Sequence, residues 1–98
     1  MHPFIREAIE DHVDRTLGEE VLVSASKMLT ESLAPTLKNI EDALYGYVFG
    51  RATEFAFSVI QVHYQRVPST DEYLEIYKII RRRAVEIKSQ IKQITSGQ

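Results

Sequence analysis

The sequence predicts an all-α fold: a four-helix bundle-like domain with two long C-terminal antiparallel helices, completed by homodimerisation. Apolar residues recur at three- and four-residue intervals through four runs, which is the spacing of one helical face. Glycine and proline together account for only seven residues, too few to mark a linker. With no internal repeat in 98 residues, we expect a single helical domain spanning residues 1–98.

Two N-terminal helices are expected before Pro35. Pro3 suits the first position of a helix, and Gly18 suits the residue past its end. Glu19 and Glu20 suit the first turn of a second helix, because carboxylates stabilise the positive end of the helix dipole. Pro35 should end or kink that helix. The expected apolar faces are Phe4, Ile5, Ala8, Ile9, His12, Val13 and Leu17 in the first helix, and Leu22, Ala25, Leu29 and Leu33 in the second.

A third helix is expected over residues 36–66, about 45 Å long at 1.5 Å per residue. Its opposite side is also weakly polar, with Gly46, Gly50, Phe57 and Tyr64 along it. Three companion helices in so short a chain would struggle to cover such a helix, so we expect a second copy to complete its burial. The main apolar stripe is Leu37, Leu44, Val48, Ala52, Phe55, Val59 and Val62.

The fourth helix should begin after Pro68. Ser69 and Glu72 have the spacing of a capping box, in which each side chain accepts a hydrogen bond from the other residue's backbone amide. The apolar residues that follow alternate steps of four and three, the 3.5-residue repeat of a helix that packs along another long helix. This seam consists of Tyr73, Tyr77, Ile80, Ala84, Ile87, Ile91 and Ile94.

The third and fourth helices are the expected contact surfaces of the homodimer. Gly46 and Gly50 have the small-xxx-small spacing that lets two helix backbones approach closely, and closed twofold pairs are the commonest assemblies. The predicted dimer interface consists of Gly46, Gly50, Phe57, Tyr73, Tyr77, Ile80, Ile87 and Ile91.

Basic residues of the fourth helix suggest an alternative function. On a straight helix they form a stripe opposite the isoleucine seam, which could contact a phosphate backbone. Against this, the chain is net acidic, and its first 20 residues carry six carboxylates against two arginines. The stripe is therefore predicted to be a solvated face or to meet the acidic first helix. The candidate nucleic-acid-binding residues are Lys78, Arg81, Arg82, Lys88 and Lys92.

No catalytic, cofactor-binding or metal-binding residues are predicted. The chain has no cysteine, which excludes disulfides, thiolate zinc sites and cysteine nucleophiles. No Glu-x-x-His pair, His-x-x-x-His pair, glycine-rich phosphate loop or nucleophile turn occurs. His12 and His63 are interpreted as packing residues, and a helix-lined pocket for an apolar ligand is a lesser alternative.

The predicted function is a non-catalytic, homo-oligomeric interaction or scaffold module that binds another protein, with nucleic-acid binding as the alternative. The first residues lack the basic-then-apolar order of a secretory signal, so a cytoplasmic location is expected. Residues 45–62 approach membrane-spanning length, but Arg51 and Glu54 lie within them, so no membrane association is expected.

Overall fold

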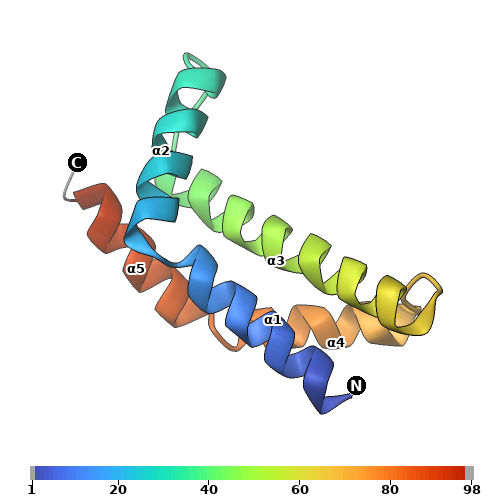
Figure 1. Ribbon diagram of the computed structural model, residues 1–98. Helices are drawn as coiled ribbons and strands as arrows, with labels where there is room; N and C mark the ends of the chain where they lie inside the picture. Colours follow the sequence, from blue (N-terminus) through green and yellow to red (C-terminus); the bar gives the residue numbers. More distant parts are fainter. Residues whose placement is uncertain (1, 97–98) are drawn as a thin grey trace.

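The computed structural model describes residues 2–96, and the described chain is all-helical, with no β-strand (Figure 1). Five helices are present in residues 2–96, where the sequence predicted four. They are α1 (Pro3–Thr16), α2 (Glu19–Leu33), α3 (Ile40–Tyr64), α4 (Thr70–Arg81) and α5 (Ala84–Ser96). The fifth helix arises because the predicted C-terminal helix is interrupted.

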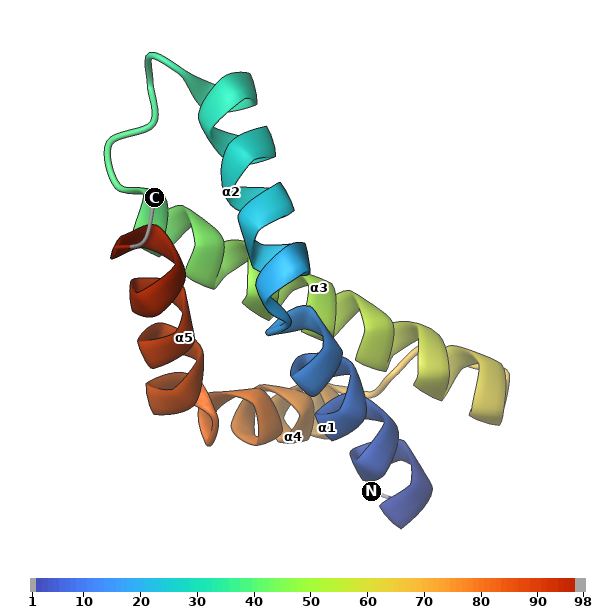
Figure 2. The same ribbon diagram turned by 60° about the vertical axis from the view of Figure 1, so that its left-hand side comes forward.

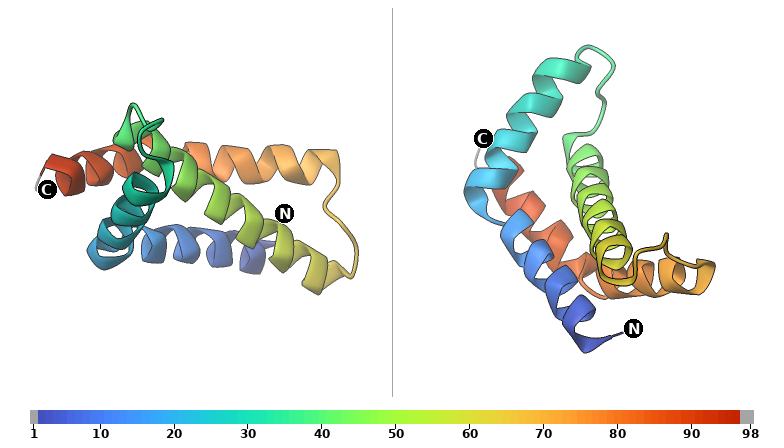
Figure 3. Two further views of the ribbon diagram at one scale, coloured as in Figure 1. Left: turned by 90° about the horizontal axis from the view of Figure 1, so that it is seen from above. Right: turned by 45° about the vertical axis from the view of Figure 1, so that its right-hand side comes forward.

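The central helix α3 contacts each of the other four helices. α1 and α2 form one bent arm, and α4 and α5 form a second (Figure 2). Because α1 packs on α4 and α2 packs on α5, the two arms enclose part of α3 between them. Seen from above, α4 runs back along α3 in the opposite direction (Figure 3). The result is an elongated molecule of 41 × 23 × 19 Å.

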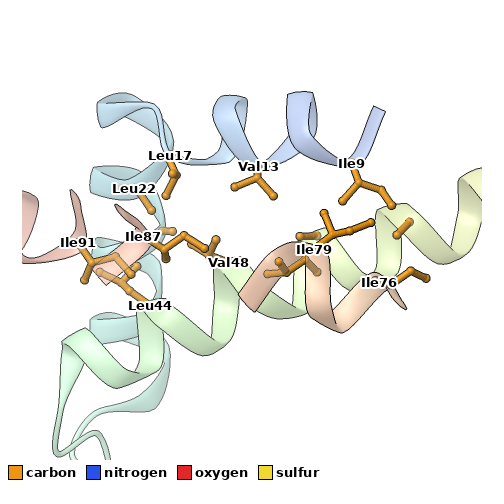
Figure 4. Packing of buried hydrophobic residues seen from close by; sticks show 14 of the residues in the cluster. Ile9, Val13, Leu17, Leu22, Leu44, Val48, Ile76, Ile79, Ile87 and Ile91 are labelled. Atoms are coloured by element: carbon orange, nitrogen blue, oxygen red, sulfur yellow. The ribbon is translucent and has the colours of Figure 1, made fainter. Parts of the chain in front are cut away.

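Aliphatic side chains from all five helices meet in one core, where α1 faces α3, α4 and α5 (Figure 4). Small residues occupy the middle of α3: Ala52 and Ala56 are fully buried and let neighbouring helices approach it closely. Val62, which the sequence placed on the buried stripe, is 79% exposed, because it lies near the end of α3. The largest fully buried side chains are Ile5, Ile9, Val13, Leu22, Leu44, Val48, Ile60, Ile76, Ile80, Ile87 and Ile91.

Side-chain caps set the start of three helices. The predicted capping box is confirmed: the amide of Glu72 donates to Ser69 Oγ at 3.2 Å, and the amide of Ser69 donates to Glu72 Oε1 at 2.8 Å. Hydrogen bonds from Arg66, and then from the Ser69 backbone, lower the pKa of Glu72 to about 2. Asn39 Oδ1 accepts from the amide of Asp42 and starts α3 four residues later than predicted, whereas His2 Nδ1 caps α1.

The prediction of one continuous C-terminal helix is wrong, because the helix ends at Arg81 and restarts at Ala84. At this point Arg83 contacts α1. Its guanidinium donates a hydrogen bond to the carbonyl of Glu10 at 3.1 Å and lies 2.5 Å from the carboxylate of Asp14. The bend turns α5 toward α2 and the start of α3 (Figure 2). The isoleucines on either side of it are therefore buried in the core of their own subunit.

The outer half of α2 extends beyond the helices that cover its first half (Figure 2). Leu22 and Ala25 are buried as predicted, whereas Leu29 is half-buried and Leu33 is 42% exposed. The predicted apolar face of the second helix is thus covered as far as Leu29 and exposed at Leu33, because neither α3 nor α5 reaches its far end.

The imidazole of His12 lies flat on the ring of Phe55 between α1 and α3, with the ring centroids 4.2 Å apart. Burial, followed by the charges of Arg15 and Arg51, lowers the pKa of His12 below its ordinary value of 6.5. The hydroxyl of Thr16 lies 3.5 Å from Nδ1 of His12 and donates a hydrogen bond to the His12 carbonyl at 2.8 Å. The His12 ring is therefore harder to protonate in the folded chain than in the unfolded chain.

We expect a pH dependence of stability from this histidine. Because the folded-state pKa is depressed, the unfolded chain binds more protons below about pH 6.5, so the free energy of unfolding should fall as the solution is acidified from pH 7 toward pH 5. Urea unfolding at several pH values measures this slope. The variant His12→Gln should lose the His12 part of the slope, and an unchanged slope would contradict the assignment.

Candidate interaction surface

Five aromatic side chains form a continuous row along the contact between α3 and α4, and they are called the aromatic strip below. Each is half-buried, and successive rings lie within the distances at which aromatic pairs attract. At one end, the ammonium of Lys88 on α5 lies 5.2 Å from the centre of the Tyr45 ring. The centroid distances are 6.5 Å for Tyr45 and Phe49, 5.6 Å for Phe49 and Tyr77, 6.2 Å for Tyr77 and Tyr73, and 5.9 Å for Tyr73 and Phe57.

Gly46 and Gly50 lie on the exposed face of α3 beside this strip. A Cβ atom added to either glycine would meet nothing within 4 Å. Each glycine within a helix costs about 0.5–1 kcal/mol relative to alanine, and no close packing inside the subunit compensates for that cost. The expected close helix crossing at these glycines does not occur within the described chain, so any such crossing must involve another molecule.

A second seam runs along this outer face of α3, and all but one of its members lie outside the core. Its members alternate steps of four and three, the same spacing that the C-terminal seam shows. The side chain of Thr53 on this seam is already satisfied, because its hydroxyl donates to the Phe49 carbonyl at 2.8 Å. This outer seam consists of Gly46, Gly50, Thr53, Phe57, Ile60 and Tyr64, of which Ile60 is covered by the subunit itself.

The predicted interface residues separate into two groups. Ile80, Ile87 and Ile91 belong to the core of their own subunit, with at most 1% of each exposed. The other five remain together on the outer side of α3 and α4: Gly46, Gly50, Phe57, Tyr73 and Tyr77. The predicted interface does not include Tyr45, Phe49 or Thr53, although the four-and-three spacing of the outer seam could have indicated Thr53.

The three consecutive arginines have different environments. Only Arg83 reaches the acidic first helix, and it also pairs with Glu86 one turn further along α5. Burial alone would lower the pKa of Arg83, but the hydrogen bonds that its guanidinium donates to Glu86 and Asp14 outweigh burial and raise that pKa. Arg81 and Arg82 are exposed, so the acidic helix does not cover them.

The helix break also divides the candidate nucleic-acid-binding residues. Lys78 and Arg82 line a shallow groove with Arg6 of α1, and this groove also contains Asp71 and Glu75. Lys88 instead lies over Tyr45 on the α3 side. All five candidate cations, Lys78, Arg81, Arg82, Lys88 and Lys92, are exposed, but they no longer follow one straight stripe.

Within residues 2–96, no three histidine, aspartate or glutamate side chains come together as a metal site. His63 is exposed and sits among the rings of His2, Phe4 and Tyr64 near the N-terminus. A hollow of about 630 Å³ is open to solvent along the outer face of α1, where four acidic side chains lie between Arg6 and Arg15.

No helix in the described chain combines the length and the apolar character needed to cross a membrane. Comparisons with protein-family models, with characterised proteins and with solved structures find no match to this chain. Its function must therefore be argued from its own surfaces.

Proposed function

We propose that this protein is a non-catalytic, homo-oligomeric helical interaction or scaffold module, and that it associates through the outer side of α3 and α4. The observation that supports this most directly is the pairing of the aromatic strip with two helical glycines that pack against nothing in their own subunit. Aromatic residues are enriched at the buried centres of protein interfaces, and glycines permit the close approach of helices.

The apolar surface left over by the fold supports the same proposal. Half-buried aromatic rings are already ordered by their neighbours, so covering them costs little additional side-chain entropy. About 25 cal/mol is gained for each Å² of apolar surface removed from water, so completing the burial of several such rings can drive association. A second copy of the chain carries the same surface and is the simplest partner.

Sedimentation analysis tests the proposal. At tens of micromolar we expect a dimer, and the variant Thr53→Lys should weaken it by at least about tenfold, because a lysine on the outer seam loses its water when a partner covers it. In the isolated subunit the same lysine can extend into solvent, so the fold should persist. The matched control Ser58→Lys, at an exposed position on the other side of α3, should leave the dimer unchanged. A compact monomer at these concentrations would refute the proposal.

Nucleic-acid binding remains the alternative, favoured by the exposure of Arg81 and Arg82. It would appear as salt-dependent retention on DNA or RNA that a combined Arg81→Glu and Arg82→Glu variant abolishes. The mixed charges in the groove beside Lys78 and the bend between α4 and α5 argue against a continuous phosphate-binding track.

A further inference from the structure

The outer seam of α3 changes in size along its length. Its first half contains only small residues, Gly46, Gly50 and Thr53, whereas its second half presents the large rings of Phe57 and Tyr64. The first half is therefore a notch, and the ring of Phe57 forms a ridge next to it on the same face, before the buried Ile60. Gly50 and Phe57 are seven residues apart, so both point in nearly the same direction from the helix axis.

Two such helices fit together in only one orientation. If they packed in parallel, glycine would face glycine and Phe57 would face Phe57, so the rings would hold the axes apart and leave the glycines without contacts. If they pack antiparallel about a point between Thr53 and Glu54, the notch of each copy receives the ridge of the other. Close packing at a uniform helix separation requires the second arrangement.

The charges at the two ends of α3 favour the same orientation. Glu41 and Asp42 occupy its first turn, and Arg66 follows its last turn. Parallel packing would place the acidic turns of the two copies side by side, which is repulsive, and would also align the helix dipoles. Antiparallel packing instead places Asp42 opposite the segment that carries Arg66, whose own partner is Glu72.

We infer that two copies of this chain pack α3 against α3 in an antiparallel twofold pair, with Phe57 of each copy filling the notch at Gly50 of the other. This inference rests on the proposed self-association and adds its geometry. It also explains why two helical glycines occupy positions where alanine would fit without a clash inside the subunit.

An exchange of residues tests the inference. The variant Gly50→Phe should weaken the dimer at least about tenfold by filling the notch, and Phe57→Gly should weaken it similarly by removing the ridge. Combining both changes in one chain moves the ridge to position 50 and the notch to position 57, so an antiparallel pair should regain an affinity within a few-fold of the original. The double variant keeps the composition and the number of helical glycines.

In a parallel pair position 50 would face position 50, so Gly50→Phe alone would bring two rings together across the gap left by the glycines and would not weaken the dimer. Unfolding curves of each variant, recorded at a concentration where the chain is monomeric, control for the loss of the contact between Phe57 and Tyr73. If the original chain dimerises and the exchange does not restore the dimer, the antiparallel geometry is wrong and the proposed function stands. If the original chain is a monomer, both are wrong.

Distances between spin labels provide a second test of the geometry, which does not depend on these substitutions. The chain has no cysteine, so Glu54→Cys and Glu41→Cys, both at exposed positions of α3, each give one labelling site per copy. In the antiparallel pair the labels at position 54 should lie within about 20 Å of each other, whereas those at position 41 should be about 38 Å apart, from the 1.5 Å rise per residue. Two short distances would overturn the inference.

Discussion

Replacing Ile87 with alanine is expected to lower the free energy of unfolding by about 2–5 kcal/mol, a large fraction of the stability of a domain of this size. The Ile87 side chain is 1% exposed and lies in the core where α5 meets α2 and α3 (Figure 4). Its removal leaves a cavity that the surrounding aliphatic side chains can only partly close. Urea unfolding monitored by circular dichroism measures the loss.

The matched control is Val85→Ala on the same helix. Val85 is 83% exposed, so its truncation should change stability by no more than about 0.5 kcal/mol. The effect of Ile87→Ala should also be independent of protein concentration, because the cavity forms inside one subunit. A loss seen only at concentrations where the chain is associated would instead place Ile87 in the dimer interface, as the sequence alone suggested.

The variant Arg83→Ala should destabilise the chain by about 1–3 kcal/mol, because it removes a hydrogen bond to the Glu10 carbonyl and ion pairs with Asp14 and Glu86. The arginine side chain is only 16% exposed, although both carboxylates are more than half exposed, which moderates the effect. Thermal and urea unfolding measure the change.

Arg82→Ala provides the control, since Arg82 is adjacent in sequence and exposed. Its effect should stay within about 0.5 kcal/mol. If both variants lose the same stability, then Arg83 has no special role at the junction of α4 and α5. A selective loss for Arg83 would show that this one arginine attaches the second arm to α1.

Helix ends were the most predictable part of the fold. Pro3 and Gly18 bracket α1, and Ser69 with Glu72 starts α4, because capping depends on residues only two to four positions apart. The break between α4 and α5 was not predictable in this way. Three arginines favour a helix and contain no breaker, so the interruption depends on a partner 73 residues away in the sequence.

The candidate surface was predicted in part. The spacing of Gly46 and Gly50 and the surplus of apolar residues on α3 indicated that helix as a contact surface. A repeat of 3.5 residues shows that a helix packs along another helix, but it does not show whether that helix belongs to the same chain. Tertiary structure assigned the isoleucines to the subunit core and left the rings of Tyr73 and Tyr77 half-buried in the aromatic strip.

The helical class and the positions of most helix ends follow from interactions among neighbouring residues, and the excess of apolar residues on α3 is visible in its composition. Which apolar face the subunit buries for itself, and where the C-terminal helix bends, became clear only from the folded chain. Those outcomes depend on contacts between segments far apart in the chain, such as that of Arg83 with α1.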